Sequence, residues 1–164
     1  MKKLSYFLIL FGLVTIISCG DDEEDSMTLG VSGTLNFDGQ SYEISSGLLV
    51  ERSNPAGAEL QFTLADGTFS SGTSSSDSQI LLSVRAISEG TNELEDGAYA
   101  VNTQTGSMYA FVTVSTSGAQ NQQSIQAGSI NISGSGSTYS LTFNDVGFLG
   151  GAELSGSVSG TFQN

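Results

Sequence analysis

The sequence predicts an all-β domain, and three features of the chain after Met27 support this class. Apolar and polar residues alternate with a period of two over much of this region, which is typical of half-buried strands. No apolar stripe with the 3.6-residue spacing of a helix is evident, and the whole chain contains one Pro. About nine short strands with one apolar and one polar face predict a single antiparallel β-sandwich or barrel.

The first two strands are joined by Asp38-Gly39. Leu35 and Phe37 alternate with polar neighbours before this pair, and Tyr42 and Ile44 do so after it. An Asp-Gly pair between alternating runs predicts a type I′ turn, because both central residues of that turn need positive φ. Seven further runs show the same alternation, and we expect strands over residues 58–64, 80–86, 99–101, 108–114, 130–132, 139–143 and 154–162.

A four-residue motif occurs near both ends of the predicted domain. Val31-Ser32-Gly33-Thr34 is repeated as Val158-Ser159-Gly160-Thr161. In a chain rich in Ser and Gly, such a repeat has two explanations, chance or similar structural settings. The second explanation predicts that the first and last strands lie side by side and close the sheet.

The run from Met108 to Val114 is apolar on both faces. Met108, Ala110, Val112 and Val114 share one face, whereas Tyr109 and Phe111 lie on the other. A central strand covered on both sides is the first interpretation, and a ligand-lined cavity or a subunit contact is the alternative.

The N-terminus has the layout of a secretory signal. Lys2 and Lys3 precede an apolar stretch over residues 4–17, and the small residue Ser18 follows it. Fourteen helical residues span roughly 21 Å, which is short of a hydrocarbon core of about 30 Å, so a transmembrane helix is the weaker interpretation. We therefore expect a signal peptide over residues 1–18.

The end of this segment, Ile16-Ile17-Ser18-Cys19, resembles the lipobox of bacterial lipoproteins. The resemblance implies that the peptide is cut before Cys19 and that this residue receives a diacylglyceryl group and a further acyl chain such as palmitate. Two or three acyl chains would hold the protein on a membrane, whereas one chain binds only marginally.

Five consecutive acidic residues, 21–25, follow the cysteine. Their mutual repulsion predicts an extended, solvated tether over residues 19–27, followed by the antiparallel β domain over residues 28–164. The run also resembles the export signal of Bacteroidota surface lipoproteins, which implies a lipid-anchored location on the cell-surface side of the outer membrane. The domain resembles only uncharacterised small β-rich lipoproteins of that group, through the runs 128–134, 139–143 and 154–162.

Composition argues against several classes of function. The chain has 17 acidic and four basic residues, a net charge of −13 and no His. Such a charge argues against nucleic-acid binding, which needs Lys and Arg. The lack of His removes the usual general base and the Ser-His and Cys-His pairs, so we expect no enzyme activity and no catalytic residues.

Carboxylates are the abundant reactive groups that remain. Glu93, Glu95 and Asp96 cluster before Gly97, where a solvated loop ending in a turn is the first interpretation. We predict no cofactor, with Ca²⁺ held by these oxygen ligands as the alternative. A carboxylate-dependent hydrolase is a further alternative, because glycosidases need two carboxylates across a cleft.

Candidate partner-binding residues are Phe69, Phe148 and Leu149, which we expect in or beside turns. Packing over an end of the sheet is the first interpretation of these residues, and an exposed apolar patch suited to a partner is the alternative. The chain has no Trp, and its tyrosines after the signal segment fall in predicted strands, where core packing is expected. The leading hypothesis is a surface-anchored, non-catalytic lipoprotein of the outer membrane that binds a glycan or protein partner or has a structural role. A barrel that carries a small apolar ligand is the alternative.

Overall fold

The computed structural model describes residues 30–70, 73–74, 78–101, 106–117 and 125–164. These residues form an all-β structure without a helix, as the sequence predicts. The signal peptide, Cys19 and the acidic tether lie outside the described residues, so their assignment stays a prediction.

Ten strands form the main sheet, and β5 and β6 form a separate two-stranded pair. The main-sheet strand that the alternation did not predict is β3. The bounds are β1 Val31–Phe37, β2 Gln40–Ile44, β3 Ser46–Asn54, β4 Gly57–Ala65, β5 Phe69–Ser70, β6 Thr73–Ser74, β7 Ile80–Glu89, β8 Gly97–Val101, β9 Met108–Thr116, β10 Ile125–Ser135, β11 Thr138–Phe148 and β12 Glu153–Thr161.

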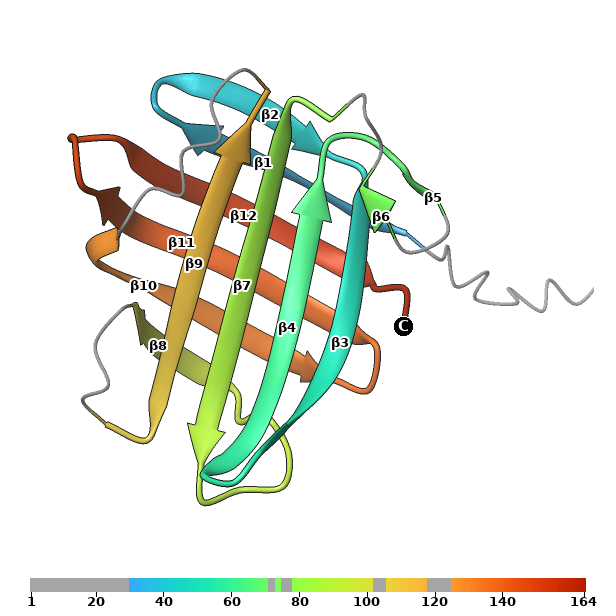
Figure 1. The fold of residues 1–164 in the computed structure, drawn as a ribbon, viewed down its shortest axis with the longest axis vertical. Helices are drawn as coiled ribbons and strands as arrows, with labels where there is room; N and C mark the ends of the chain where they lie inside the picture. Colours follow the sequence, from blue (N-terminus) through green and yellow to red (C-terminus); the bar gives the residue numbers. More distant parts are fainter. Residues whose placement is uncertain (1–29, 71–72, 75–77, 102–105, 118–124) are drawn as a thin grey trace, which may run out of the picture.

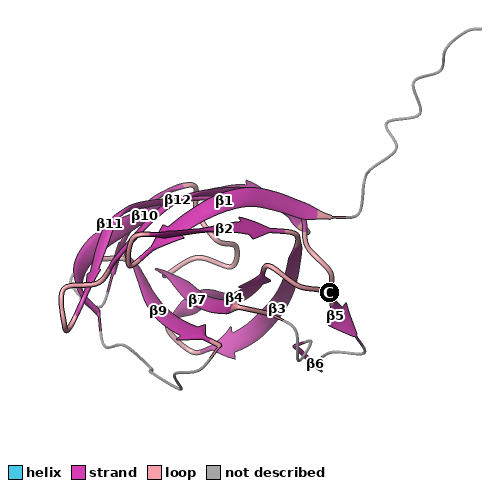
Figure 2. Cartoon of the chain, turned by 90° about the horizontal axis from the view of Figure 1, so that it is seen from above, coloured by secondary structure: helices cyan, strands magenta, loops and turns pink. Residues whose placement is uncertain are grey.

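The main sheet is nearly closed into a barrel. Its strands follow the order β2-β1-β12-β11-β10-β8-β9-β7-β4-β3. Figure 1 shows β9, β7, β4 and β3 as a layer that crosses in front of β10, β11, β12 and β1. Seen from above, the two layers curve toward each other around a shared interior (Figure 2). The architecture is therefore one continuous barrel-like sheet, not two separate sheets.

The sheet passes between its layers at two corners. At the first, β8 pairs with β9 in parallel through Ala100–Tyr109 and Val101–Ala110, whereas the other main-sheet pairs are antiparallel. At the second, the end of the chain bridges to β3. The Leu49 amide donates to the Gln163 carbonyl at 2.7 Å, and the Gln163 amide donates to the Gly47 carbonyl at 3.0 Å.

The predicted turn at Asp38-Gly39 is confirmed. The two residues have φ of 50° and 76°, and Phe37 pairs directly with Gln40 across the β1–β2 hairpin. Positive φ at both central positions is the requirement of a type I′ turn, which matches the right-handed twist of the two strands.

The two copies of the repeated motif lie opposite each other in the sheet. Strands β1 and β12 are antiparallel neighbours, and Ser32 lies opposite Ser159 at the centre of the two motifs. Val31 pairs with Gly160, and Gly33 pairs with Val158, so each Val faces the Gly of the other copy. The prediction that these strands lie side by side is confirmed. The prediction that they close the sheet is wrong, because they lie within it and the closure is made by β3 and Gln163.

The interior is filled by apolar side chains from both layers. Phe62 of β4 is fully buried, and its ring lies edge-on to Tyr139 of β11 and to Phe162, each at 5.2 Å between centroids. The two layers are therefore joined by aromatic packing as well as by the continuous sheet.

The two apolar faces of β9 have different environments. Val112 and Val114 belong to the interior core. Tyr109 and Phe111 face outward, with their rings edge-on at 5.8 Å, and the guanidinium of Arg85 lies 5.0 Å from the centre of the Phe111 ring. Arg85 also forms an ion pair with Glu59 at 3.0 Å. The outward aromatic residues are thus packed within a cluster on the sheet surface rather than around an interior cavity.

Candidate functional site

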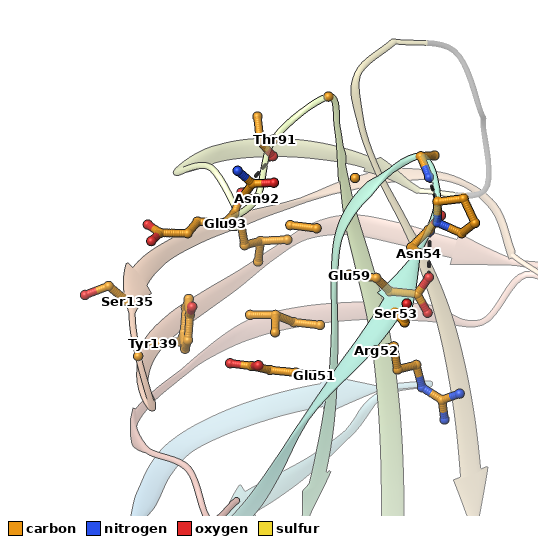
Figure 3. A pocket seen from close by; sticks show the side chains of 18 of the residues that line it. Glu51, Arg52, Ser53, Asn54, Glu59, Thr91, Asn92, Glu93, Ser135 and Tyr139 are labelled. Atoms are coloured by element: carbon orange, nitrogen blue, oxygen red, sulfur yellow. Dashed lines mark hydrogen bonds between the residues drawn. The ribbon is translucent and has the colours of Figure 1, made fainter.

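A cavity of about 630 Å³ lies at one end of the barrel. Three segments line it: the β3–β4 hairpin, the loop between β7 and β8, and the β10–β11 hairpin. Figure 3 shows Glu51, Tyr139, Ser135 and Glu93 along one side of this pocket. We call this cavity the end pocket.

The register of β3 and β4 places a carboxylate in the end pocket. Leu49 pairs with Phe62 in the core, and the next pair on the same face is Glu51 with Leu60. Because alternate residues of a strand share a face, Glu51 continues the inward row of Leu49 at the point where the core ends. Its side chain therefore lines the pocket instead of packing in the interior.

The β10–β11 hairpin supplies the aromatic residue of the end pocket. The side chain of Tyr139 is 7% exposed, and its ring is supported from inside by Phe62. The Tyr139 hydroxyl has no hydrogen-bond partner among the described residues. Burial is the largest cause that raises the pKa of Tyr139 above 10.0, and the negative charges of Glu51, Asp96 and Glu93 raise it further.

A closed ring of hydrogen bonds holds the loop between β7 and β8. The Tyr99 hydroxyl donates to the Glu95 carbonyl at 2.5 Å, and the Glu95 amide donates to Ser88 Oγ at 3.1 Å. Ser88 Oγ completes the ring at 2.7 Å from the Tyr99 hydroxyl oxygen. Ser88 and Tyr99 are both buried, so the loop that lines the pocket is anchored from within the barrel.

The structure separates the three carboxylates proposed as metal ligands. Glu93 lines the end pocket. Asp96 accepts a hydrogen bond from the Gly134 amide at 2.8 Å and thereby joins the loop to the β10–β11 hairpin. Glu95 contributes its backbone to the Tyr99 ring, and its side chain is exposed. No group of three acidic, His or Cys residues suited to a metal ion forms in the described ranges. Binding of Ca²⁺ stays an untested alternative.

The apolar candidates for partner binding also lie in different environments. Phe148 is 2% exposed and packs edge-on against Phe37 at 5.4 Å, as the packing interpretation predicts, so its side chain is not accessible to a partner. Its neighbour Leu149 is 56% exposed in the turn after β11. Phe69 is half-buried and lines a smaller cavity of about 180 Å³ elsewhere in the molecule. The three residues therefore do not form one patch.

Sequence reasoning did not identify Glu51 or Tyr139 as site residues. Glu51 occupies an inward position of a strand that the alternation missed, and a charge at such a position is the signal that could have marked it. Tyr139 is buried, as was expected for the tyrosines in strands, but its hydroxyl faces a cavity and not a polar partner in the core.

Replacing Tyr99 with phenylalanine is expected to lower the free energy of unfolding by about 1–3 kcal/mol, because the buried Ser88 hydroxyl and the Glu95 carbonyl lose a partner. Burial also raises the pKa of Tyr99 above 10.0. A pKa raised by folding stabilises the fold below pH 10 and loses this effect as the pH rises further, so stability should fall in strong alkali. Urea unfolding from pH 8 to 11 tests both points. A fall of the same steepness in the variant would contradict the role of Tyr99.

In the described residues, no helix is long and apolar enough to cross a membrane. The chain matches no protein-family model, no curated protein and no solved structure. Its function must therefore be inferred from its own residues and fold.

Proposed function

We propose that the chain is a non-catalytic, lipid-anchored protein of the outer-membrane surface whose β domain binds a saccharide in the end pocket. The observation that supports binding is a polar cavity at the end of a barrel whose interior is otherwise packed. The lipobox and the acidic run support the anchored location.

The lining of the end pocket suits a ligand rich in hydroxyl groups. Its volume of about 630 Å³ lies within the usual range for small-ligand sites, about 300–1,000 Å³. Ser53, Asn92 and Ser135 provide donors and acceptors, and Leu60 and Leu94 provide apolar surface. Sugars present both hydroxyl groups and C–H faces, so this mixture fits them.

A small apolar ligand is the weaker candidate. Core side chains occupy the space between the two layers. An apolar molecule in the end pocket would leave buried polar groups, such as the Tyr139 hydroxyl, without hydrogen bonds, which costs about 1–3 kcal/mol for each group. A saccharide avoids this cost.

Hydrolysis of a glycan is the second candidate function. Glu51 and Glu93 come from separate segments and line the same cavity, and glycosidases use two carboxylates for acid–base and nucleophilic chemistry. Release of reducing ends from a polysaccharide panel, abolished by Glu51→Gln and Glu93→Gln, would replace our proposal. Binding without product supports the non-catalytic role.

The anchored location predicts a simple result on cells. Protease added to intact cells should remove the domain, because the tether holds it outside the outer membrane. Replacing Cys19 with serine should release the protein from the membrane fraction, since two or more acyl chains are needed for stable anchoring. A domain that survives protease on intact cells but is digested after lysis would contradict surface exposure.

Saccharide binding is tested with the chain from Ser26 onward, which contains every strand of the described fold. We expect a set of neutral and charged polysaccharides to include a binder, and Tyr139→Phe or Ser135→Ala to weaken its binding. The measurement should be repeated with Ca²⁺ and with a chelator. If the chelator abolishes binding, the result supports a calcium ion in the binding site. If no saccharide of the panel binds, a structural or protein-partner role is favoured.

A further inference from the structure

We propose that the end pocket selects a saccharide that carries a protonated amine, that is, an amino sugar with a free ammonium group. This inference rests on the proposed saccharide binding and names the chemical class of the ligand. Three observations on the described residues support it: two carboxylates without an ion pair, the hydroxyl of a buried tyrosine without a hydrogen-bond partner, and arginine side chains directed to the outer face of the sheet.

Two carboxylates of the end pocket are free to accept hydrogen bonds from a ligand. Glu51 and Glu93 form no ion pair or side-chain hydrogen bond among the described residues. Asp96 differs from them, because its carboxylate is engaged by the Gly134 amide. Carboxylates only accept hydrogen bonds, so a ligand next to Glu51 and Glu93 must supply donors.

The two cations of the β domain, Arg85 and Arg52, form no ion pair with Glu51 or Glu93 in the described residues, although Arg52 also lines the end pocket. Arg85 forms an ion pair with Glu59 on the outer face of the sheet. Arg52 lies opposite Glu59 in the β3–β4 register, so its side chain belongs to the outer face, whereas Glu51 belongs to the inner one. Figure 3 shows the Arg52 guanidinium directed away from Glu51. In the part of the chain that the structure describes, neither arginine therefore pairs with the two carboxylates.

The third observation is the Tyr139 hydroxyl. Its side chain is 7% exposed, lines the pocket and has no hydrogen-bond partner in the described part of the chain. Figure 3 shows Tyr139 between Glu93 and Glu51. Buried polar groups are almost always paired, so this hydroxyl is expected to meet a group of the ligand.

These three groups together match an ammonium ion. An ammonium carries three donors and one positive charge, and all three residues, which line the same cavity, offer it an acceptor oxygen. The sugar hydroxyls would then face the Ser and Asn side chains of the lining. An acidic sugar would be repelled by the carboxylates, and an N-acetylated sugar would lack the charge.

The test is calorimetric titration of the full chain, purified in detergent, with the glucosamine dimer and with its N-acetylated counterpart. We expect the free amine to bind roughly tenfold more tightly or better, since a hydrogen bond to a charged group is worth about 1.5–3 kcal/mol. Raising the salt concentration should weaken the glucosamine dimer more than the N-acetylated dimer.

Variants locate the effect in the pocket. Glu51→Gln and Glu93→Gln should each reduce affinity for the glucosamine dimer roughly tenfold, and Tyr139→Phe should do so by a smaller factor. Glu43→Gln is the matched control, because Glu43 lies on β2, accepts a hydrogen bond from Thr34 and does not line the pocket. This control should leave the affinity unchanged within about twofold.

The outcomes separate this inference from the proposed function. Equal binding of the two dimers, with no effect of the Gln variants, would overturn the selection of an amine and leave saccharide binding standing. If neither dimer binds and no saccharide of the panel binds, both the amine selection and the proposed saccharide binding are overturned. Equal binding of cadaverine, a diamine without hydroxyl groups, would overturn the choice of a sugar as the carrier of the amine.

Discussion

Replacing Phe62 with alanine is expected to lower the free energy of unfolding by about 3–5 kcal/mol, the usual loss for a fully buried aromatic ring. Phe62 lies on β4, and its ring contacts Tyr139 of the opposite layer and Phe162 beyond β12. The substitution removes both aromatic contacts and leaves a cavity between the layers. Urea unfolding monitored by circular dichroism at 25 °C measures the loss.

The matched control is Val50→Ala on the neighbouring strand β3. Val50 is 48% exposed and faces outward, so its truncation should change the stability by about 0.5 kcal/mol or less. Phe62→Leu keeps apolar volume in the core and should cost less than Phe62→Ala. It should still weaken ligand binding in the end pocket, because the Tyr139 ring loses its edge-on support. An equal unfolding midpoint for Phe62→Ala and Val50→Ala would contradict the packing between the layers.

Local signals in the sequence predicted much of the fold. The Asp38-Gly39 pair determines its turn through the backbone geometry of two adjacent residues, so no distant contact was needed to predict it. The alternating runs depend only on which face of a strand is buried, and nine of the ten main-sheet strands followed from them.

Strand β3 was missed for a reason that bears on function. Its inward row begins with Gly47 and Leu49 but continues with Glu51 and Ser53, so the apolar alternation stops halfway along the strand. The inward residues change from apolar to polar because this part of β3 lies beyond the core and lines the end pocket. A pattern that marks burial cannot mark the part of a strand that lines a polar cavity.

The site itself depends on contacts that are distant in sequence. Asp96 and Gly134 are 38 residues apart, yet their hydrogen bond joins two segments of the pocket. The acidic cluster 93–96 was therefore read as one unit, whereas the fold directs one side chain to the pocket, one to a hairpin and one to solvent. The burial of Phe148 likewise depends on a distant contact, because its partner Phe37 belongs to a strand more than a hundred residues earlier in the chain.

Replacing Gly156 with alanine is expected to destabilise the fold by about 3–4 kcal/mol, through backbone strain and steric overlap of similar size. Gly156 lies in β12 with φ of +120°, a conformation that residues with a side chain rarely adopt. A Cβ at this position would also overlap the carbonyl oxygen of Thr34 on the neighbouring strand β1. The clashing atom belongs to the backbone, so it cannot move without displacing β1.

Gly147→Ala is the control for this prediction. Gly147 also lies in a strand of the same layer, but no atom lies within 4 Å of the place where its Cβ would be, and its φ is not in the strained range. Its substitution should change the free energy of unfolding by about 0.5 kcal/mol or less. Because neither Gly156 nor Thr34 lines the end pocket, a folded Gly156→Ala variant at low temperature should keep its ligand affinity. Equal stability of the two alanine variants would show that β1 and β12 do not approach as closely as their pairing requires.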